Sequence, residues 1–406
     1  MEHGLNLECS DSLKTYTMKR LIVFLNVSDI KRQCSIYSAL LCLLVSLCSC
    51  HQPENNMTQC RVVDSIDSFS ISNYMICPPK DSIYLCQTYP FSQSLTGGKC
   101  NEIVVYDDRE HALIFFRDSV LLRHIQLSQH GVNAVSARVQ SFVPVNDDSI
   151  WVYDQVAFYL INGSGEVIAK HKDEEYVFAG SNYAMHTAHM GWQDNGILLY
   201  PTTDGKSFKI KMYDHRKREI VNEIRFTYPS CNPNGNKKYP YMECPNVTFA
   251  RNKVIYNFPY EKNIHVIDLL TEDIREYSIQ SVFAKESLKP YGEDGNSADW
   301  MRYNWSNNHF YEVSYLPALD IYVRPMLGGA DMKRYGNSGS VVDARKLYLS
   351  FFDSQFNTIG EMELQEHRYS NFHGWCSLSD GMAVYVDNML GGNHEELVYD
   401  VIKPVL

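Results

Sequence analysis

The sequence predicts an all-β fold, a six-bladed β-propeller. A short apolar strand after a polar turn recurs six times along the 406 residues, and in most repeats two further strands follow it. β-Branched and aromatic residues fill most of the apolar runs, which favours strands. The leading strands begin near residues 82, 149, 196, 253, 320 and 382, so that one repeat takes 47 to 67 residues. Repeats of this length with several strands each are typical of a propeller and not of an α-solenoid, although an array of two-sheet β-sandwiches is the alternative.

Each repeat is expected to form one blade, and the second repeat shows the pattern most clearly. Asn162 and Gly163 separate two apolar runs, 158–161 and 167–170, behind the leading strand. An Asn-Gly turn between two such runs is a strong hairpin signal. The strands expected for the six blades are, in order, 81–85, 113–116 and 120–127; 148–154, 158–161 and 167–170; 196–200, 208–213 and 220–226; 253–256, 264–269 and 274–279; 320–323, 347–352 and 358–364; and 382–386 and 397–402.

A further strand is expected on the inner side of five blades, facing the central channel. These inner strands are 141–145, 183–190, 247–251, 309–316 and 374–378. Most strands are continuous apolar runs rather than strict alternations, as expected when neighbouring blades cover both faces of a sheet. The last repeat runs out of chain, and we expect residues 61–66, which precede the first blade, to supply its missing outer strand. Such a strand would close the ring and remove an open edge.

The N-terminal segment has the features of an export signal. Lys31 and Arg32 precede an apolar run at 36–47. That run is too short to span ~30 Å of hydrocarbon as a helix, but it has the length of a signal-peptide core. It ends at Leu-Cys-Ser-Cys, residues 47–50, which is followed by polar residues and resembles the lipobox of bacterial lipoproteins. The resemblance implies that residues 1–49 are removed and that Cys50 is lipidated; a secretory signal cut near the same place is the alternative.

These features divide the chain into a lipoprotein signal peptide at 1–49, a polar tether at 50–59 and the propeller domain at 60–406. The formal net charge is −11, from 37 basic and 48 acidic residues, so the chain has no basic field that would hold a nucleic acid. We therefore expect the membrane, through the lipid anchor, as one partner and no nucleic acid. Because no acidic run follows Cys50, we expect an outer-membrane anchor in the cell envelope that faces the periplasm.

One disulfide is a candidate. Apart from Cys50, the mature chain has seven cysteines, an odd number, so at least one thiol is free or pairs with another chain. Cys231 and Cys244 enclose a polar loop and are the best candidates for a bridge, which would stabilise the fold by ~3 kcal/mol. Two unlinked thiols are the alternative.

Side chains that suit a polar ligand cluster on the expected inner strands and their loops. The candidate ligand-binding residues are His186, His189, Trp192, Arg302, Trp305, His309, Tyr311, Arg324, His373 and Trp375. Aromatic faces bury a large area, and a neighbouring Arg or His fixes the orientation of a polar ligand. The pattern therefore predicts a sugar or peptide site at the mouth of the channel. The alternative is that these residues pack between blades and satisfy buried carbonyl groups.

The sequence contains no recognisable catalytic, metal or cofactor motif. It has no P-loop, no Gly-x-Ser-x-Gly elbow and no His-Glu-x-x-His of a zinc protease. His186 and His189 would point to opposite faces of a strand, which argues against a two-histidine zinc site. We therefore assign no catalytic residue, no metal ligand and no cofactor.

Four short motifs spread over most of the mature chain point to a family. They are Leu-Arg-His-Ile-Gln-Leu at 122–127, Gly-Val-Asn at 131–133, Asp-Asp-Ser-Ile at 147–150 and Tyr-Val-Arg at 322–324. Together with a lipobox and six blades, they resemble the DUF4221-type lipoproteins of Bacteroides. That family has no assigned activity, so the resemblance implies a cell-envelope location and a propeller fold.

Two functions of different classes fit the sequence. The first is a non-catalytic binding or assembly protein that holds a glycan, a peptide or an envelope partner on the propeller. The second is a hydrolase or lyase that acts on a polysaccharide with His, Tyr and Arg side chains in the channel. A glycosidase needs paired carboxylates, and the expected inner strands are poor in Asp and Glu. We therefore expect binding rather than catalysis.

Overall fold

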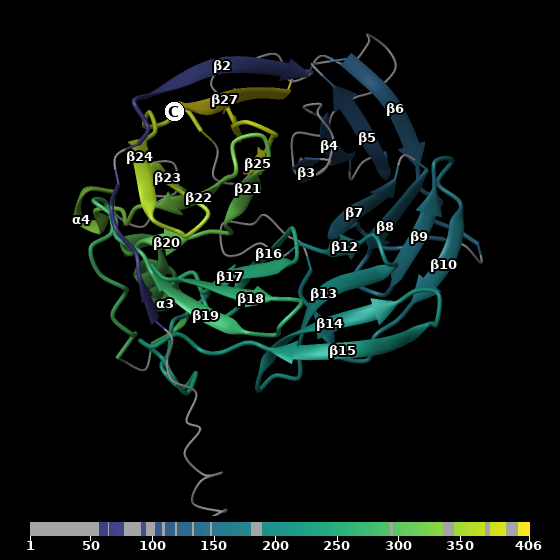
Figure 1. Ribbon diagram of the computed structural model, residues 1–406, viewed down its shortest axis with the longest axis horizontal. Coiled ribbons are helices and arrows are strands. Elements are labelled where there is room, and N and C mark those ends of the chain that lie inside the picture. Colours follow the sequence, from purple (N-terminus) through teal and green to yellow (C-terminus); the bar gives the residue numbers. More distant parts are fainter. Residues whose placement is uncertain are drawn as a thin grey trace, which may run out of the picture. The chain divides into compact units, whose positions relative to one another are not determined.

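Six β-sheets are arranged in a ring (Figure 1), so the predicted six-bladed β-propeller is confirmed. The computed structural model describes residues 57–63, 65–76, 91–94, 102–107, 110–117, 120–131, 134–146, 148–179, 189–292, 295–335, 345–369, 374–386 and 397–406. Two helices, α3 (Ser297–Ser306) and α4 (Met332–Tyr335), lie in connections between strands. Within these described ranges, no helix has both the length and the apolar character needed to cross a membrane.

The blades follow one another along the chain, and each runs from an inner to an outer strand. Blade 1 consists of β3 (Phe91–Ser94), β4 (Glu102–Asp107), β5 (Ala112–Arg117) and β6 (Val120–Gln126), and blade 2 consists of β7 (Ser141–Asn146), β8 (Ser149–Tyr153), β9 (Phe158–Asn162) and β10 (Val167–His171). Blade 3 consists of β11 (Tyr176–Val177), β12 (Gly191–Gln193), β13 (Ile197–Thr203), β14 (Phe208–Asp214) and β15 (Glu219–Arg225), and blade 4 consists of β16 (Asn246–Ala250), β17 (Lys253–Asn257), β18 (Ile264–Asp268) and β19 (Ile274–Ser278). Blade 5 consists of β20 (His309–Phe310), β21 (Ser314–Leu316), β22 (Ile321–Leu327), β23 (Leu347–Phe352) and β24 (Thr358–Glu363), and blade 6 consists of β25 (Trp375–Ser377), β26 (Met382–Tyr385), β27 (Leu397–Val405) and β2 (Ser68–Ile76). The inner strands predicted at 141–145, 247–251, 309–316 and 374–378 are confirmed as β7, β16, β20 with β21, and β25. The one predicted at 183–190 falls mostly outside the described residues, and β12 follows it.

In blade 1 the leading strand was predicted in the wrong place. Residues 81–85 lie outside the described residues, and the second strand of the blade is β4. Alternate side chains of β4 are buried on both faces, because Ile103 packs against blade 6 and Val104 packs against blade 2. With β4 in this position, the second strands begin at residues 102, 149, 197, 253, 321 and 382. The first two repeats then differ in length by a single residue.

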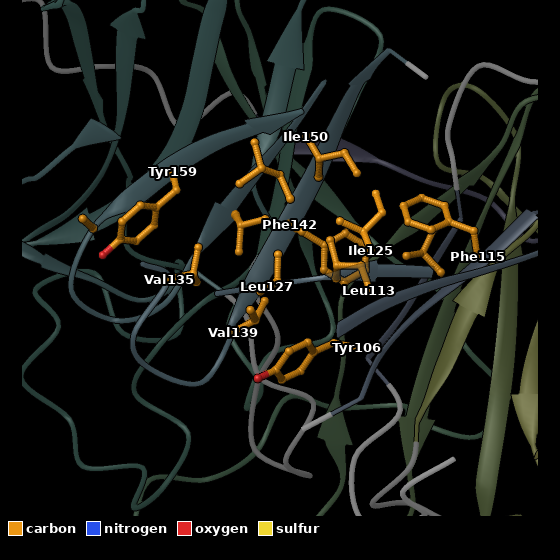
Figure 2. Packing of buried hydrophobic residues seen from close by; sticks show 14 residues of the cluster. Tyr106, Leu113, Phe115, Ile125, Leu127, Val135, Val139, Phe142, Ile150 and Tyr159 are labelled. Atoms are coloured by element: carbon orange, nitrogen blue, oxygen red, sulfur yellow. The ribbon is translucent and has the colours of Figure 1, made fainter. Parts of the chain in front are cut away.

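Apolar side chains between neighbouring blades form the core. Figure 2 shows the cluster between blades 1 and 2, in which Leu113 and Phe115 of β5 pack with Ile150 of β8 and Tyr159 of β9. All four are at most 1% exposed. Burying one large apolar side chain contributes about 1.5–3 kcal/mol, so these clusters are the main source of stability. Because each blade is covered on both sides, middle strands such as β5 and β8 are buried along nearly their whole length, whereas the outer strands β6 and β15 alternate between exposed and half-buried side chains.

The ring is closed by the N-terminal strand β2, which pairs antiparallel with β27 and forms the outer strand of blade 6 (Figure 1). Closure by an N-terminal strand is confirmed, but the strand begins at Ser68 and not within 61–66. The two faces of β2 contact different blades. The Phe69 ring lies 5.2 Å from the Phe351 ring of blade 5, between centroids, whereas Tyr74 is buried among residues of blades 1 and 6.

The residues before β2 also hold blades 4 and 5. β1 (Met57–Gln59) pairs in parallel with β19, the outer strand of blade 4. Further along, the backbone N–H of Val63 donates to the Thr358 carbonyl of blade 5 at 2.6 Å, and the Thr358 N–H donates to the Arg61 carbonyl at 2.8 Å. The segment that was predicted to complete blade 6 therefore lies along blade 5. Through β1, these residues and β2, the N-terminal chain joins three consecutive blades.

A buried carboxylate secures the closing strand. Asp400 of β27 is 1% exposed and pairs in register with Asn73 of β2. Its oxygens accept hydrogen bonds from Asn73 Nδ2 at 2.6 Å and from Tyr369 OH at 2.9 Å. Arg368 donates to the same carboxylate from Nε at 2.6 Å and from Nη2 at 3.0 Å. One side chain thus ties the closing strand, the last strand and the connection between blades 5 and 6.

A second buried polar network lies between blades 2 and 3. Lys211 Nζ of β14 donates to both oxygens of Asp173, in the connection after β10, at 2.8 and 2.9 Å. Tyr200 OH donates to Asp173 Oδ2 at 2.7 Å and contacts His171 Nε2 at 2.8 Å. Burial acts to raise the pKa of Asp173, but the hydrogen bond from Lys211 and those from other donors outweigh it. The pKa of this carboxyl therefore lies below its ordinary value.

We expect Lys211→Met to lower the free energy of unfolding by about 3–5 kcal/mol at neutral pH, because it leaves the Asp173 carboxylate buried without its cation. A carboxyl whose pKa is depressed by folding stabilises the fold above its unfolded pKa and loses that contribution as it is protonated. The loss should therefore shrink as the pH falls below 3.8, the ordinary value of this group. Urea unfolding at neutral and acidic pH measures both effects.

The matched control is Lys217→Met. Lys217 is 62% exposed at its side chain and lies 3.6 Å from Asp214, so its removal should cost less than about 1 kcal/mol. A loss for Lys211→Met that is as small as the control, or that does not change with pH, would contradict the assigned ion pair.

Candidate functional site

The inner strands of adjacent blades are tied together by hydrogen bonds at the centre of the ring. The backbone N–H of His189, just before β12, donates to the Val247 carbonyl of β16 at 3.0 Å. Asn246 Nδ2, also of β16, donates to the Phe310 carbonyl of β20 at 2.8 Å. These bonds fix the inner strands of blades 3, 4 and 5 relative to one another, and they position the side chains that the strands carry.

Glu312 lies at the centre of the candidate site. It belongs to the segment between β20 and β21 and is 4% exposed. Trp375 of β25 donates from Nε1 to Glu312 Oε1 at 2.7 Å, which joins the inner strands of blades 5 and 6. The Tyr311 and Trp375 rings meet edge to face with centroids 4.6 Å apart, and the His309 ring lies 4.8 Å from that of Tyr311. Glu312 was not predicted as a site residue, although a lone acidic residue in an expected inner strand is a signal that could have found it.

Burial and the charge of Glu312 shift the pKa values of two neighbours. Burial lowers the pKa of His189, and the carboxylate of Glu312 opposes this without cancelling it, so the imidazole is neutral at pH 7. Burial raises the pKa of Tyr311, Arg345 acts against this rise, and Glu312 adds to it. The Tyr311 hydroxyl therefore stays protonated.

This arrangement suits the recognition of a polar ligand. A carboxylate accepts hydrogen bonds from hydroxyl or amino groups, and a neutral imidazole donates one hydrogen bond and accepts another. The partly exposed Trp375 ring supplies apolar area beside these polar groups, and the buried Tyr311 ring packs against it. His189 and Trp375 are both partly exposed, so solvent reaches the group. Hydrogen bonding and ring contact are thus available to one ligand.

Three of the predicted site residues meet around Glu312: His189, Tyr311 and Trp375. His309 is fully buried and packs against Tyr311. Arg324 lies elsewhere, in the packing between blades 4 and 5, where it is 1% exposed. Its guanidinium carbon lies 4.7 Å from the centroid of the Phe310 ring and 5.6 Å from that of Phe352. Arg324 therefore follows the alternative in which such side chains fill the space between blades.

The remaining predicted residues lie away from Glu312 or outside the described residues. Trp192 of β12 packs in the core between blades 2 and 3, with its ring 5.4 Å from that of His215. Arg302 and Trp305 are carried by α3, where Arg302 is exposed and lies 4.0 Å from Asp299. His186, His373 and Cys50 fall outside the described residues.

The predicted disulfide between Cys231 and Cys244 is not formed, and both residues are free thiols. Their surroundings differ: the Cys231 thiol hydrogen-bonds with Tyr239, whereas Cys244 lies near Tyr176. Burial raises the pKa of Cys231 to about 12 and that of Cys244 to about 11. A disulfide needs specific Cβ positions and directions, and the enclosure of a polar loop by two cysteines does not supply them.

A second group of ligand-type side chains, which was not predicted, lies on blade 4. Glu261 from the β17–β18 loop, His265 of β18 and Glu276 of β19 bring their ligand atoms within 4.8 Å of one another. Burial raises the pKa of Glu261, and His265 opposes this rise. Burial lowers the pKa of His265, but Glu261 outweighs it and the pKa is raised. No motif marks this group, because His265 and Glu276 become neighbours only through the pairing of β18 with β19.

Comparison with known proteins finds solved structures of the same fold. The chain is similar to the solved structure of a DUF4221 family member from Bacteroides vulgatus, with a TM-score of 0.67 and 17% identity over 83% of this chain and 99% of that one. It is also similar to a protein from Bacteroides fragilis that is thought to be exported, with a TM-score of 0.52 and 12% identity over 86% of this chain and 99% of that one. The resemblance to DUF4221-type proteins is thus confirmed at the level of the fold. No protein-family model matches the chain, and no curated protein matches it.

Proposed function

We propose that the chain is a lipid-anchored propeller of the cell envelope that binds a glycan, a peptide or an envelope partner at its central channel without changing it chemically. The observation that carries this proposal is the Glu312 carboxylate, which is held by the Trp375 indole and flanked by Tyr311 and a neutral His189. The anchor rests on the lipobox-like residues 47–50 and on the likeness to a protein thought to be exported. We place it in the outer membrane, facing the periplasm.

Among these ligands, the site favours a glycan. Sugar hydroxyls donate hydrogen bonds to a carboxylate, and the apolar face of a sugar ring stacks on an aromatic side chain. Glu312 and Trp375 offer both within one hydrogen-bonded pair. A peptide would bind the same carboxylate through an amino group. The binding experiment below distinguishes a peptide from a glycan.

The alternative of a polysaccharide hydrolase or lyase has less support. Glycoside hydrolysis uses two carboxyl groups about 5–9.5 Å apart, and in the described parts of the inner strands Glu312 is the one carboxylate. Two of the acid–base candidates, His309 and Arg324, are at most 1% exposed. Both are used in packing, so neither is placed to exchange a proton with a bound sugar.

The binding proposal is tested with the purified full-length protein against defined oligosaccharides and peptides. We expect an oligosaccharide to raise the thermal midpoint, and Glu312→Gln to weaken its binding at least about tenfold, because a hydrogen bond to a charged group contributes ~1.5–3 kcal/mol. Trp375→Phe removes the indole donor and should weaken binding in the same direction. Isothermal titration measures the affinities.

Trp305→Phe is the matched control, because Trp305 lies on α3 and not at Glu312. It should bind the oligosaccharide as the wild type does. Equal affinity in Glu312→Gln would contradict the site, binding of peptides alone would contradict the preference for a glycan, and conversion of the oligosaccharide to product would favour the enzyme.

The anchor is tested by metabolic labelling with a fatty-acid analogue in a bacterial host that processes lipoproteins. Cys50→Ser should lose the label and leave the membrane fraction, because anchoring depends on acyl chains that contribute ~0.8 kcal/mol for each buried CH₂ group. Cys60→Ser is the control: Cys60 is buried in the core between blades 4 and 5, and it should keep both the label and the location. A Cys50→Ser protein that stays labelled would contradict lipidation at this residue.

A further inference from the structure

Glu261 and His265 are held in fixed orientations on blade 4. Both are fully buried, and His265 Nε2 lies 3.0 Å from Glu261 Oε1 and 3.2 Å from Oε2. Glu261 Oε1 also accepts a hydrogen bond from the Phe258 backbone N–H at 3.0 Å. The His265 ring stacks on that of Tyr256, with centroids 4.7 Å apart and planes at 13°. Neither side chain is free to turn away from the other.

Glu276 completes a set of ligand atoms with the spacing of a metal site. All three ligand atoms lie within 4.8 Å of one another. First-row metal ions bind carboxylate oxygen and imidazole nitrogen at ~2.1 Å, so two ligands of one ion are at most ~4.2 Å apart. The three ligand atoms therefore need to move by only a few tenths of an ångström each to bind one ion.

Asn263 is a second, independent indication. It is 8% exposed, and its Nδ2 donates to Glu276 Oε1 at 2.6 Å, so the amide lies against the cluster with its nitrogen toward Glu276. Its Oδ1 is buried and has no hydrogen-bond partner among the described residues. Leaving a buried polar atom without a partner is unfavourable. A half-turn of the amide would place this oxygen, instead of the nitrogen, beside a cation at Glu276 and would give it a partner.

We propose that Glu261, His265 and Glu276, with the amide oxygen of Asn263, bind one divalent first-row transition-metal ion such as Zn²⁺ or Mn²⁺. Oxygen ligands with one imidazole suit these ions, because Ca²⁺ and Mg²⁺ prefer oxygen ligands alone and Cu⁺ prefers sulfur. The site is separate from the channel group around Glu312, and it does not depend on the proposed ligand of that group.

The ion would link three parts of blade 4 and a neighbouring connection. Glu276 is half-buried, and the exposed Ser230 donates to its Oε1 from Oγ at 2.9 Å, so an ion reaches the cluster from this side. Once bound, the ion joins the β17–β18 loop to β18 and β19. Through Ser230 it also holds the connection between blades 3 and 4. Its role is therefore structural.

The test is a titration of the purified, chelator-treated full-length protein with Co²⁺, whose absorption spectrum reports its ligands. We expect one Co²⁺ per chain, with the weak visible bands of nitrogen and oxygen ligation, displaced by Zn²⁺. Zn²⁺ alone should raise the thermal midpoint of the wild-type protein. Intense sulfur-to-metal charge-transfer absorption would assign the ion to cysteines and overturn the proposal, as would the lack of a bound equivalent.

Glu276→Gln keeps the size of the side chain and should weaken Co²⁺ binding at least about tenfold. Glu272→Gln, at an exposed position in the turn between β18 and β19, is the matched control and should bind as the wild type does. Circular dichroism verifies that both variants are folded. Unchanged Co²⁺ affinity in Glu276→Gln would overturn the site and would leave His265 and Glu261 as a plain ion pair.

Discussion

The pairing of β2 with β27 joins the two ends of the ring, and the packing of several blades depends on it. Each blade is stable because its neighbours cover both of its faces. Without β2, the ring would be open and β27 of blade 6 would have an unpaired edge. β2 pairs with that edge, and through Phe69 and Tyr74 it also fills space beside blades 5 and 1. Asp400 secures this strand with hydrogen bonds from three side chains. The same N-terminal chain continues along blades 5 and 4, so one segment restrains half of the ring.

Ring closure matters for function because no single blade carries the channel site. Glu312 belongs to blade 5, Trp375 to blade 6 and His189 to blade 3. The hydrogen bond from Trp375 to Glu312 requires blades 5 and 6 at their native separation, and β2 completes blade 6. The metal-type cluster has a different origin, because its three ligands come from the strands and loop of blade 4 alone. The channel site therefore depends on the ring, and the cluster depends on one blade.

The blades could be predicted because apolar runs and turn residues recur along the chain, and these local signals survive in the fold. Two errors came from choices that only tertiary contacts decide. Residues 81–85 match the leading strand of blade 2 in their Asp-Ser-Ile triplet, but β4 is the strand buried on both faces. The segments 61–66 and 68–76 are adjacent and both could form the closing strand. The structure pairs 68–76 with β27 as that strand.

The candidate sites were predicted only in part, for similar reasons. Aromatic and histidine residues on the inner strands were recognised by type, and His189, Tyr311 and Trp375 do gather. Their shared partner Glu312 was not predicted, because a single acidic residue among apolar neighbours forms no motif. His265 and Glu276 are eleven positions apart in sequence, and they become neighbours only through cross-strand register. Sequence spacing alone does not reveal such a group.

Hydrogen exchange measured by mass spectrometry on Asp400→Asn tests most directly whether ring closure holds the channel site. Loss of the carboxylate should loosen β2, and we predict that peptides from β2, β27 and β25, which carries Trp375, all exchange faster than in the wild type. Glu363→Gln, which removes an exposed ion pair with Lys346, should leave these rates unchanged. Faster exchange confined to β2 and β27, with β25 as protected as before, would contradict the dependence of the site on closure.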